Sequence, residues 1–280
     1  MIKATINSKG DLEVGQCDVS PTVYLDHWAL RRLSEDEALA GRFRTALEAR
    51  NGTLALSWLN VGEFAKVTSV EQGRMAERLV ESSLPRVFFL EVEPFRVIER
   101  EDRLLAGGPP ETPHADLDLL SGVVMLKPEG VQLLTARELF QVVQGSSLIQ
   151  GLDDLADTVV GRVSSLRDEI VADPDFRRLV QRLPAGIQIQ RGTRFVLREL
   201  VRSLLIDQRL RITRNHAIDF LHAVVPVAYC DLVLLDKHWE AQVERVRLRL
   251  EAAGLRIPIA KVFSGKAKEV ERFLQVLESG

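Results

Sequence analysis

The chain of 280 residues has only two cysteines, Cys17 and Cys230, and they match no zinc-ligand spacing. So few cysteines exclude a disulfide framework and indicate a reducing compartment, so we expect a cytoplasmic protein. No apolar run reaches membrane-spanning length, because His222 and Pro226 interrupt the longest one. The first residues, MIKATINSKG, are polar where a signal peptide would be apolar. We therefore expect a soluble intracellular protein with no membrane partner.

The sequence also lacks a strong charge of either sign, with 37 basic and 40 acidic residues and a net charge of −3. No overall basic field indicates nucleic-acid binding, so any such attraction would have to come from a local patch. Phosphate-loop, H-E-x-x-H and G-x-S-x-G motifs are absent, which excludes the enzyme classes that they mark. Apolar residues make up 46% of the chain and charged residues 28%, which indicates a folded protein.

Strand patterns alternate with helix patterns in two parts of the chain, and this alternation favours a parallel α/β sheet covered by helices on both faces. One helix is predicted from Trp28 to about Arg50. Strands are predicted at 22–26, 53–58, 86–93, 229–236 and 257–263. We therefore expect an α/β core formed by residues 1–95 and 212–280, with an all-helical insertion at 96–211.

Three aspartates, Asp219, Asp231 and Asp236, border the apolar run at 215–239. An isolated buried carboxylate is costly, so each should lie at the end of an element, meet a cation or bind a metal. Asp26 and Asp236 each end a predicted strand, and the tips of adjacent strands stand about 5 Å apart. Asp231 precedes Asp236 by roughly 16 Å of strand at about 3.3 Å per residue, which excludes it as a ligand of the same site.

Two further acids are predicted at the same end of the sheet. Pro226 and the residues after it are expected to form a turn, so Asp219 lies in the first turn of its helix, near the strand's carboxyl end. Glu63 lies near the start of the helix that follows the second strand. Each acid alone could be a helix cap or a surface charge, but together they suit a hard cation such as Mg²⁺ or Mn²⁺.

Three segments resemble the PIN domain, a fold of metal-dependent nucleases: VYLD at 23–26, LNVGEF at 59–64 and AIDFLHAVVPVAYCDLVLLDKHW at 217–239. The resemblance covers the α/β core and not the insertion. It implies that Mg²⁺ or Mn²⁺, the cofactor of RNA cleavage, is held by Asp26, Glu63, Asp219 and Asp236. The chain departs from many relatives at Leu234, where they carry Ser or Thr two residues before the last aspartate.

These patterns leave three hypotheses for function: a metal-dependent endoribonuclease, a DNA nuclease with the same site chemistry, and a non-catalytic module that binds nucleic acid or protein. The four carboxylates favour the enzyme, whereas Leu234 and the large insertion favour the module. The expected partner is RNA or single-stranded DNA, with a protein inhibitor or a second copy of the chain as alternatives.

A basic stripe is predicted on one helix of the insertion. At 100° per residue its members fall within an arc of roughly 80°, opposite an apolar face. The stripe comprises Arg191, Arg194, Arg198 and Arg202. It could contact phosphates, or it could be a solvated face that pairs with acids elsewhere.

Overall fold

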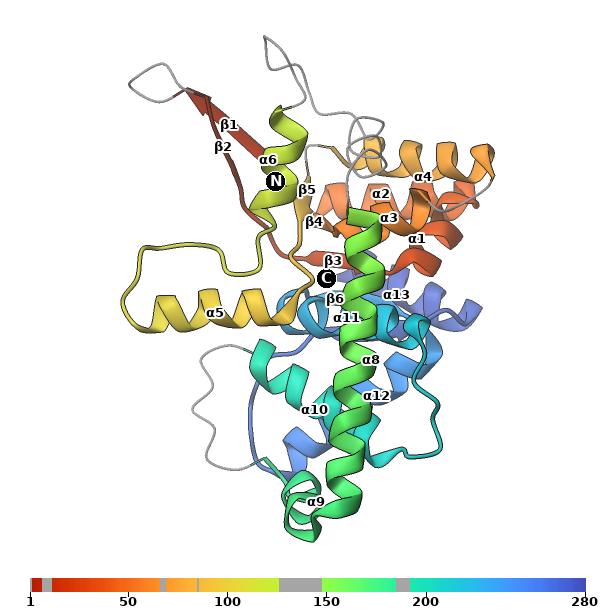
Figure 1. Cartoon of the computed structure of the whole chain (residues 1–280). Helices are drawn as coiled ribbons and strands as arrows, with labels where there is room; N and C mark the ends of the chain where they lie inside the picture. Colours follow the sequence, from red (N-terminus) through yellow and green to blue (C-terminus); the bar gives the residue numbers. More distant parts are fainter. Residues whose placement is uncertain (1, 7–11, 66–68, 85, 126–147, 185–191) are drawn as a thin grey trace.

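A computed structural model describes residues 2–6, 12–65, 69–84, 86–125, 148–184 and 192–280. Its centre is a five-stranded parallel sheet with the strand order β5-β4-β3-β6-β7. Figure 1 labels four of these strands, β3 to β6. The strands are β3 (Thr22–Leu25), β4 (Thr53–Leu56), β5 (Val87–Phe89), β6 (Leu232–Leu235) and β7 (Lys261–Ser264). The protein is therefore an α/β protein with a parallel sheet flanked by helices, as the alternating patterns predicted.

The order of the strands reverses direction between β3 and β6. From β3 the chain adds β4 and β5 on one side, and it later adds β6 and β7 on the other. In open parallel sheets, ligands bind outside the carboxyl ends of the strands at such a reversal. Asp26 and Asp236 are the first residues after β3 and β6, so both lie at this point.

One face of the sheet is formed by alternate strand residues, including Val23, Leu25 and Leu234. These residues share a face because successive side chains on a strand point to opposite faces of the sheet. The face packs against buried side chains of surrounding helices. These helices are α1 (His27–Ser34), α2 (Glu37–Ala49), α3 (Trp58–Ala65), α4 (Val70–Ser83), α6 (Leu117–Met125) and α13 (Ala267–Ser279).

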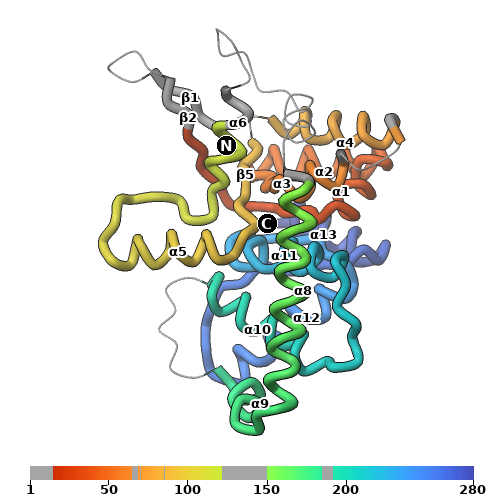
Figure 2. The backbone as a smooth tube through the Cα atoms, in the orientation of Figure 1, coloured from red at the N-terminus to blue at the C-terminus, as the bar shows by residue number. Residues whose placement is uncertain are grey.

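The other face carries Tyr24, Val233 and Leu235, and helices from both halves of the chain cover it. These are α5 (Pro94–Leu105), α8 (Leu148–Ala172), α10 (Thr193–Ile206), α11 (Arg214–Tyr229) and α12 (Lys237–Ala252). The tube in Figure 2 shows the long α8 running across α11. The insertion thus shares one hydrophobic core with the sheet, and the division into 1–95 plus 212–280 and 96–211 stays a prediction.

Helices dominate the described part of the insertion, which also holds α9 (Pro174–Gln181). Asp173 and Pro174 separate α8 from α9: the Asp173 side chain accepts hydrogen bonds from the N–H groups of Asp175 and Phe176. Ala115 forms an isolated antiparallel bridge with Leu90. Residues 126–147 of the predicted helical insertion lie outside the described residues. None of the described helices is long and apolar enough to cross a membrane.

Several predicted boundaries are wrong for local reasons. The single helix expected over 28–50 is two helices, because Asp36 caps α2 by accepting from the N–H groups of Ala38 and Leu39. Only residues 22–25, 53–56, 87–89, 232–235 and 261–263 of the predicted strands are strand, and β7 extends one residue beyond its prediction, to Ser264. A hairpin of β1 (Ile2–Ile6) and β2 (Leu12–Gln16) was not predicted, and Figure 1 shows it beside α6.

The expected turn at Pro226 is also wrong, since α11 continues through this proline to Tyr229. Proline disfavours a helix interior because it lacks an N–H group. Here the residues around it are buried against the sheet, and that packing overrides the local preference. Asp219 is therefore in the second turn of α11 rather than the first, and Thr213, not Asp219, caps the helix.

Candidate functional site at the carboxyl ends of the strands

Asp26 and Asp236 follow neighbouring strands and are held in the same way. The backbone N–H of Asp26 donates to the Leu234 carbonyl across the sheet at 3.1 Å. Asp26 Oδ1 accepts from the N–H of Ala29 at 2.7 Å, and Asp236 Oδ1 accepts from the N–H of Trp239 at 2.8 Å. Each aspartate thus caps a helix with one oxygen, and no described residue donates a hydrogen bond to its Oδ2.

Asp219 and Glu63 join this pair electrostatically. Burial, with the charges of Asp219 and Glu63, raises the pKa of Asp26 to about 7, against the Ala29 N–H and His222. Burial, followed by the charge of Asp236, likewise raises the pKa of Asp219 to about 7. Like charges raise a carboxyl pKa only at short range. Charge effects therefore link Asp26, Glu63, Asp219 and Asp236, which we refer to as the carboxylate cluster.

Asp231 lies at the opposite end of the sheet, as predicted. Its Oδ2 accepts a hydrogen bond of 2.7 Å from the backbone N–H of Thr22, the first residue of β3. The predicted position of Asp231 at the far end of the strand from Asp236 is confirmed, and its side chain joins the beginnings of β3 and β6.

A buried histidine of α11 holds Glu63. His222 is 2% exposed, and its Nε2 lies 2.9 Å from Glu63 Oε2. Burial lowers the pKa of His222, but the charge and hydrogen bond of Glu63 outweigh this, so the pKa is raised overall. On the other side of the ring, Nδ1 lies 2.5 Å from the Tyr24 hydroxyl. The orientation of Glu63 is therefore tied to the core of the sheet.

The same hydrogen-bond chain continues below the site. The Tyr24 hydroxyl lies 3.0 Å from Ser57 Oγ, which donates to Asn60 Oδ1 at 2.9 Å. Asn60 Nδ2 in turn donates to the Leu25 carbonyl at 2.9 Å. We did not predict these supporting residues. The available signal was spacing, since Tyr24 lies two residues before Asp26 on a strand and His222 lies three after Asp219 on a helix.

Carboxylate oxygens are the ligands that Mg²⁺ and Mn²⁺ prefer, so the donor chemistry of the cluster fits such an ion. Within the described residues, no three Asp, Glu, His or Cys side chains meet around a single point where a metal could bind. No lysine or arginine of the described chain forms an ion pair with Asp26, Asp219 or Asp236. Asp26, Asp219 and Asp236 thus carry charge that no lysine or arginine of the described residues offsets, whereas Glu63 is paired with His222.

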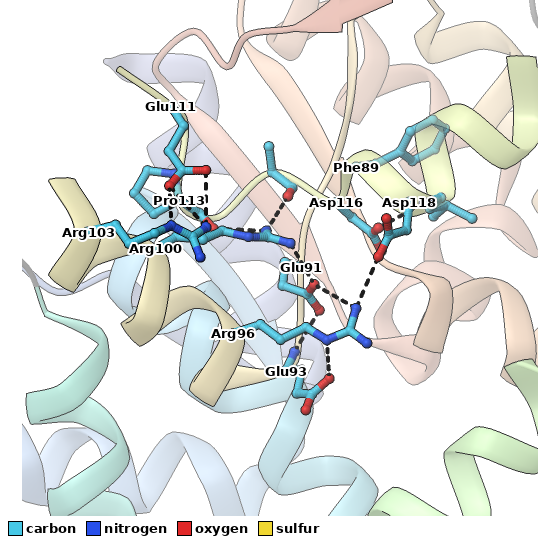
Figure 3. Close-up of polar contacts among 12 residues, drawn as sticks. Phe89, Glu91, Glu93, Arg96, Arg100, Arg103, Glu111, Pro113, Asp116 and Asp118 are labelled. Carbon is cyan, nitrogen blue, oxygen red and sulfur yellow. Dashed lines mark hydrogen bonds and ion pairs between the residues drawn. The ribbon is translucent and has the colours of Figure 1, made fainter. Parts of the chain in front are cut away.

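In a second group of acids, at the end of β5, the carboxylates lie close to arginines (Figure 3). The Glu91 carboxylate lies 3.5 Å from Arg100 and 3.8 Å from Arg96. Arg96 also contacts Asp118 at 3.1 Å. Arginines therefore contact these acids, which indicates a structural role and distinguishes them from Asp26, Asp219 and Asp236.

The predicted arginine stripe is engaged with acids where it is described. Arg194 contacts Asp102 at 2.6 Å, while Arg198 and Arg202 lie 3.6 and 3.9 Å from Glu199. Arg191 lies outside the described residues. The apolar side of α10 is buried, as predicted. Phosphate binding by the whole stripe stays a prediction: the pair of Arg194 with Asp102 favours the alternative of a face paired with acids, whereas Arg202 lies near Glu199 without a hydrogen bond to it.

In comparisons with protein-family models, curated proteins and solved structures, the chain matches none of them. The resemblance to PIN domains therefore stays a prediction that rests on the residues quoted above.

Proposed function

We propose that the protein is a PIN-like nuclease that hydrolyses RNA phosphodiester bonds with Mg²⁺ or Mn²⁺. The observation that carries this proposal is the cluster of Asp26, Glu63, Asp219 and Asp236 at the reversal of strand order. Natural selection for stability alone would offset such buried charges with arginine or remove them. A divalent cation offsets them equally well and at the same time supplies a reactive centre.

The roles of the side chains follow from what each already binds. Asp26 and Asp236 would offer the oxygen that their helix caps leave unused. Glu63 would be oriented by His222, and Asp219 would add a fourth oxygen from α11. When bound, a divalent ion activates water for attack on phosphorus and stabilises the leaving oxygen. The chain's own contribution is to fix the carboxylates on rigid elements around that position.

The second candidate is a non-catalytic nucleic-acid or protein-binding module that has kept the same scaffold. It is favoured by the absence, among the described residues, of three side chains that converge on one point. Leu234 also favours it, because a fully buried leucine stands where many PIN domains carry a hydroxyl.

Metal-dependent thermal stability tests the site without any assumption about substrate. An ion that binds only the folded state stabilises it by about 2.7 kcal/mol at a hundredfold excess over Kd. We expect millimolar Mn²⁺ to raise the melting temperature of wild type and of Asp231→Asn, which removes an acid far from the site. Asp236→Asn should respond much less, because it lacks one ligand but keeps the cap to Trp239. An equal Mn²⁺ response in Asp236→Asn and wild type would refute the four-carboxylate site.

Cleavage of labelled single-stranded RNA and of DNA of the same sequence then separates the three hypotheses. We expect Mn²⁺-dependent RNA cleavage that falls by more than about a hundredfold in Asp26→Asn, since even outer-shell partners of a metal contribute ten- to a hundredfold. Cleavage of DNA alone would identify the DNA nuclease. Metal binding without cleavage of either strand would identify the non-catalytic module.

A further inference from the structure

A pocket of 560 Å³ lies between α10 and α12, away from the carboxylate cluster. The two helices pack against one another along it. Its polar lining includes Glu199, Arg202, Ser203, Asp207, Gln242, Arg245 and Arg249. The pocket thus gathers several arginines from two separate helices, which the sequence did not predict.

The buried acid of this pocket, Glu199, lies near three arginines. Glu199 is 2% exposed, and its Oε2 accepts from Arg249 Nε at 2.7 Å. Arg249 also donates to the Arg182 carbonyl at 2.6 Å, so its guanidinium is well satisfied. Arg198 and Arg202 reach the same carboxylate only at 3.6 and 3.9 Å. Glu199 therefore offsets Arg249 and leaves Arg202 with little compensation.

Arg202 has a donor that lacks an acceptor. Its Nε is buried and makes no hydrogen bond within the described chain, since 3.9 Å to Glu199 is too long. Burial, followed by the positive charge of Arg249, lowers the pKa of Arg202, while Glu199 opposes this effect. A buried unsatisfied N–H is costly, and rotation of the Arg202 guanidinium toward an anion in the pocket would remove that cost.

Arg245 supplies the second free guanidinium. It is exposed, and its one described hydrogen bond, 3.3 Å long, goes to the neutral amide of Gln242. No acid in the described part of the chain forms an ion pair with it. Asp207 also lines the pocket, so its acids, Asp207 and Glu199, face three arginines, Arg202, Arg245 and Arg249. The pocket keeps an excess of positive charge.

We propose that the pocket between α10 and α12 binds a phosphate group through Arg202 and Arg245. Guanidinium N–H groups match phosphate oxygens in geometry and charge, and Ser203 and Gln242 line the same pocket as neutral partners. The exposed side chains of Ile206 and Leu248 flank it, so the non-phosphate part of a ligand would meet an apolar wall. The phosphate belongs either to a small phosphorylated molecule or to a nucleic-acid strand.

This site does not require that the carboxylate cluster be catalytic. It lies on α12, whose first residues lead back toward Asp236, and Gln242 Nε2 lies 3.4 Å from His238 Nε2. If the bound phosphate belongs to a strand, the pocket would hold that strand beside the nuclease site. A small phosphorylated ligand would instead make it a separate binding site.

The first experiment measures binding of inorganic phosphate and of a nucleoside monophosphate by calorimetry. The proteins are wild type, Arg202→Gln, Arg245→Gln and the control Arg74→Gln, which removes one exposed arginine from α4. We expect affinity to fall about tenfold in both pocket variants and to stay unchanged in the control, because a charge-assisted hydrogen bond contributes about that factor. Arg245 is exposed, so its variant keeps the test valid even if Arg202→Gln fails to fold.

The second experiment measures binding of labelled single-stranded RNA without metal across a range of salt concentrations. If the phosphate belongs to a strand, Arg245→Gln should weaken binding and reduce the log–log salt slope by about 0.7, the value for one contact on a single strand. A loss confined to phosphate and the monophosphate would identify a small ligand. Both results support the site, whereas affinities equal to those of Arg74→Gln for all three ligands would overturn it. Asp26→Asn should bind phosphate as wild type does, which separates this result from failure of the nuclease proposal.

Discussion

Asp26 has two opposed effects on stability. Its side chain caps α1 through the N–H of Ala29, which stabilises the helix. Its charge is buried beside Asp219 and Glu63, which destabilises the folded protein whenever no cation is bound. Asparagine separates the two effects because it keeps the capping oxygen and removes the charge.

We therefore expect Asp26→Asn to raise the free energy of unfolding at pH 8 without metal, by on the order of 1 kcal/mol. Asp26→Ala also removes the charge but loses the cap, which costs about 1 kcal/mol. Urea unfolding of both variants in EDTA measures the difference. Equal loss of stability in the two variants would mean that the buried charge of Asp26 does not destabilise the folded state.

At the scale of elements, the end of β5 is held to α5 and α6 by a network of acids and arginines (Figure 3). Arg100 Nη1 donates to the carbonyls of Pro113 and Ala115, so it anchors the loop before α6 to α5. Asp116 caps the start of α6 through the N–H of Leu119. The carboxylate of Glu91 lies among these groups and is 3% exposed.

This network predicts a pH dependence of stability. Burial, then the charge of Asp116, raises the pKa of Glu91 from 4.5 to about 7, against the nearby arginines. Between these values the folded state holds a proton that the unfolded state has released. Stability contributed by Glu91 therefore falls as pH rises from about 4.5 and levels off above about 7.

Glu91→Gln should remove this pH dependence. Between pH 5 and 7.5 the free energy of unfolding of wild type should therefore fall by up to about 3 kcal/mol more than that of the variant. Urea unfolding at several pH values measures it. Glu93→Gln serves as the control, because that side chain is 32% exposed and its pair with Arg96 contributes little. Parallel curves for Glu91→Gln and wild type would show that Glu91 titrates alike in both states.

At the scale of the whole molecule, the insertion and the α/β core share one hydrophobic core. Leu152 and Ala156 of α8 and Leu200 of α10 belong to the same buried cluster as Tyr24 and Val233 of the sheet. Removing the insertion helices would expose that face of the sheet to water. A shared core of this kind favours unfolding in a single step.

We expect Leu200→Ala on α10 to lower the free energy of unfolding by about 2–5 kcal/mol. Two spectroscopic probes should report the same shift of the unfolding midpoint. The first probe is tryptophan fluorescence, because Trp28, Trp58 and Trp239 all lie outside the insertion. The second is circular dichroism at 222 nm, to which the helices of the insertion contribute. Two separate transitions in the variant would show that the insertion unfolds on its own.

The sequence by itself determined the features that depend on local patterning. Alternating strands and helices predicted the parallel sheet, and strand-terminal acids predicted that Asp26 and Asp236 lie together while Asp231 lies apart. These inferences succeed because side-chain periodicity and the direction of parallel strands leave few other arrangements. The helix over 214–229 shows the limit, since burial against the sheet carried α11 through Pro226.

Only the tertiary structure decided which residues from distant segments meet. The contact of His222 with Glu63 and Tyr24 joins three segments, and the pocket of Arg202 and Arg245 joins two helices. Local propensity cannot specify such contacts because each depends on how whole elements pack and on how far they are rotated. The same reason explains why Arg194 on α10 pairs with Asp102 of α5, whereas Arg198 and Arg202 both lie near Glu199 of their own helix.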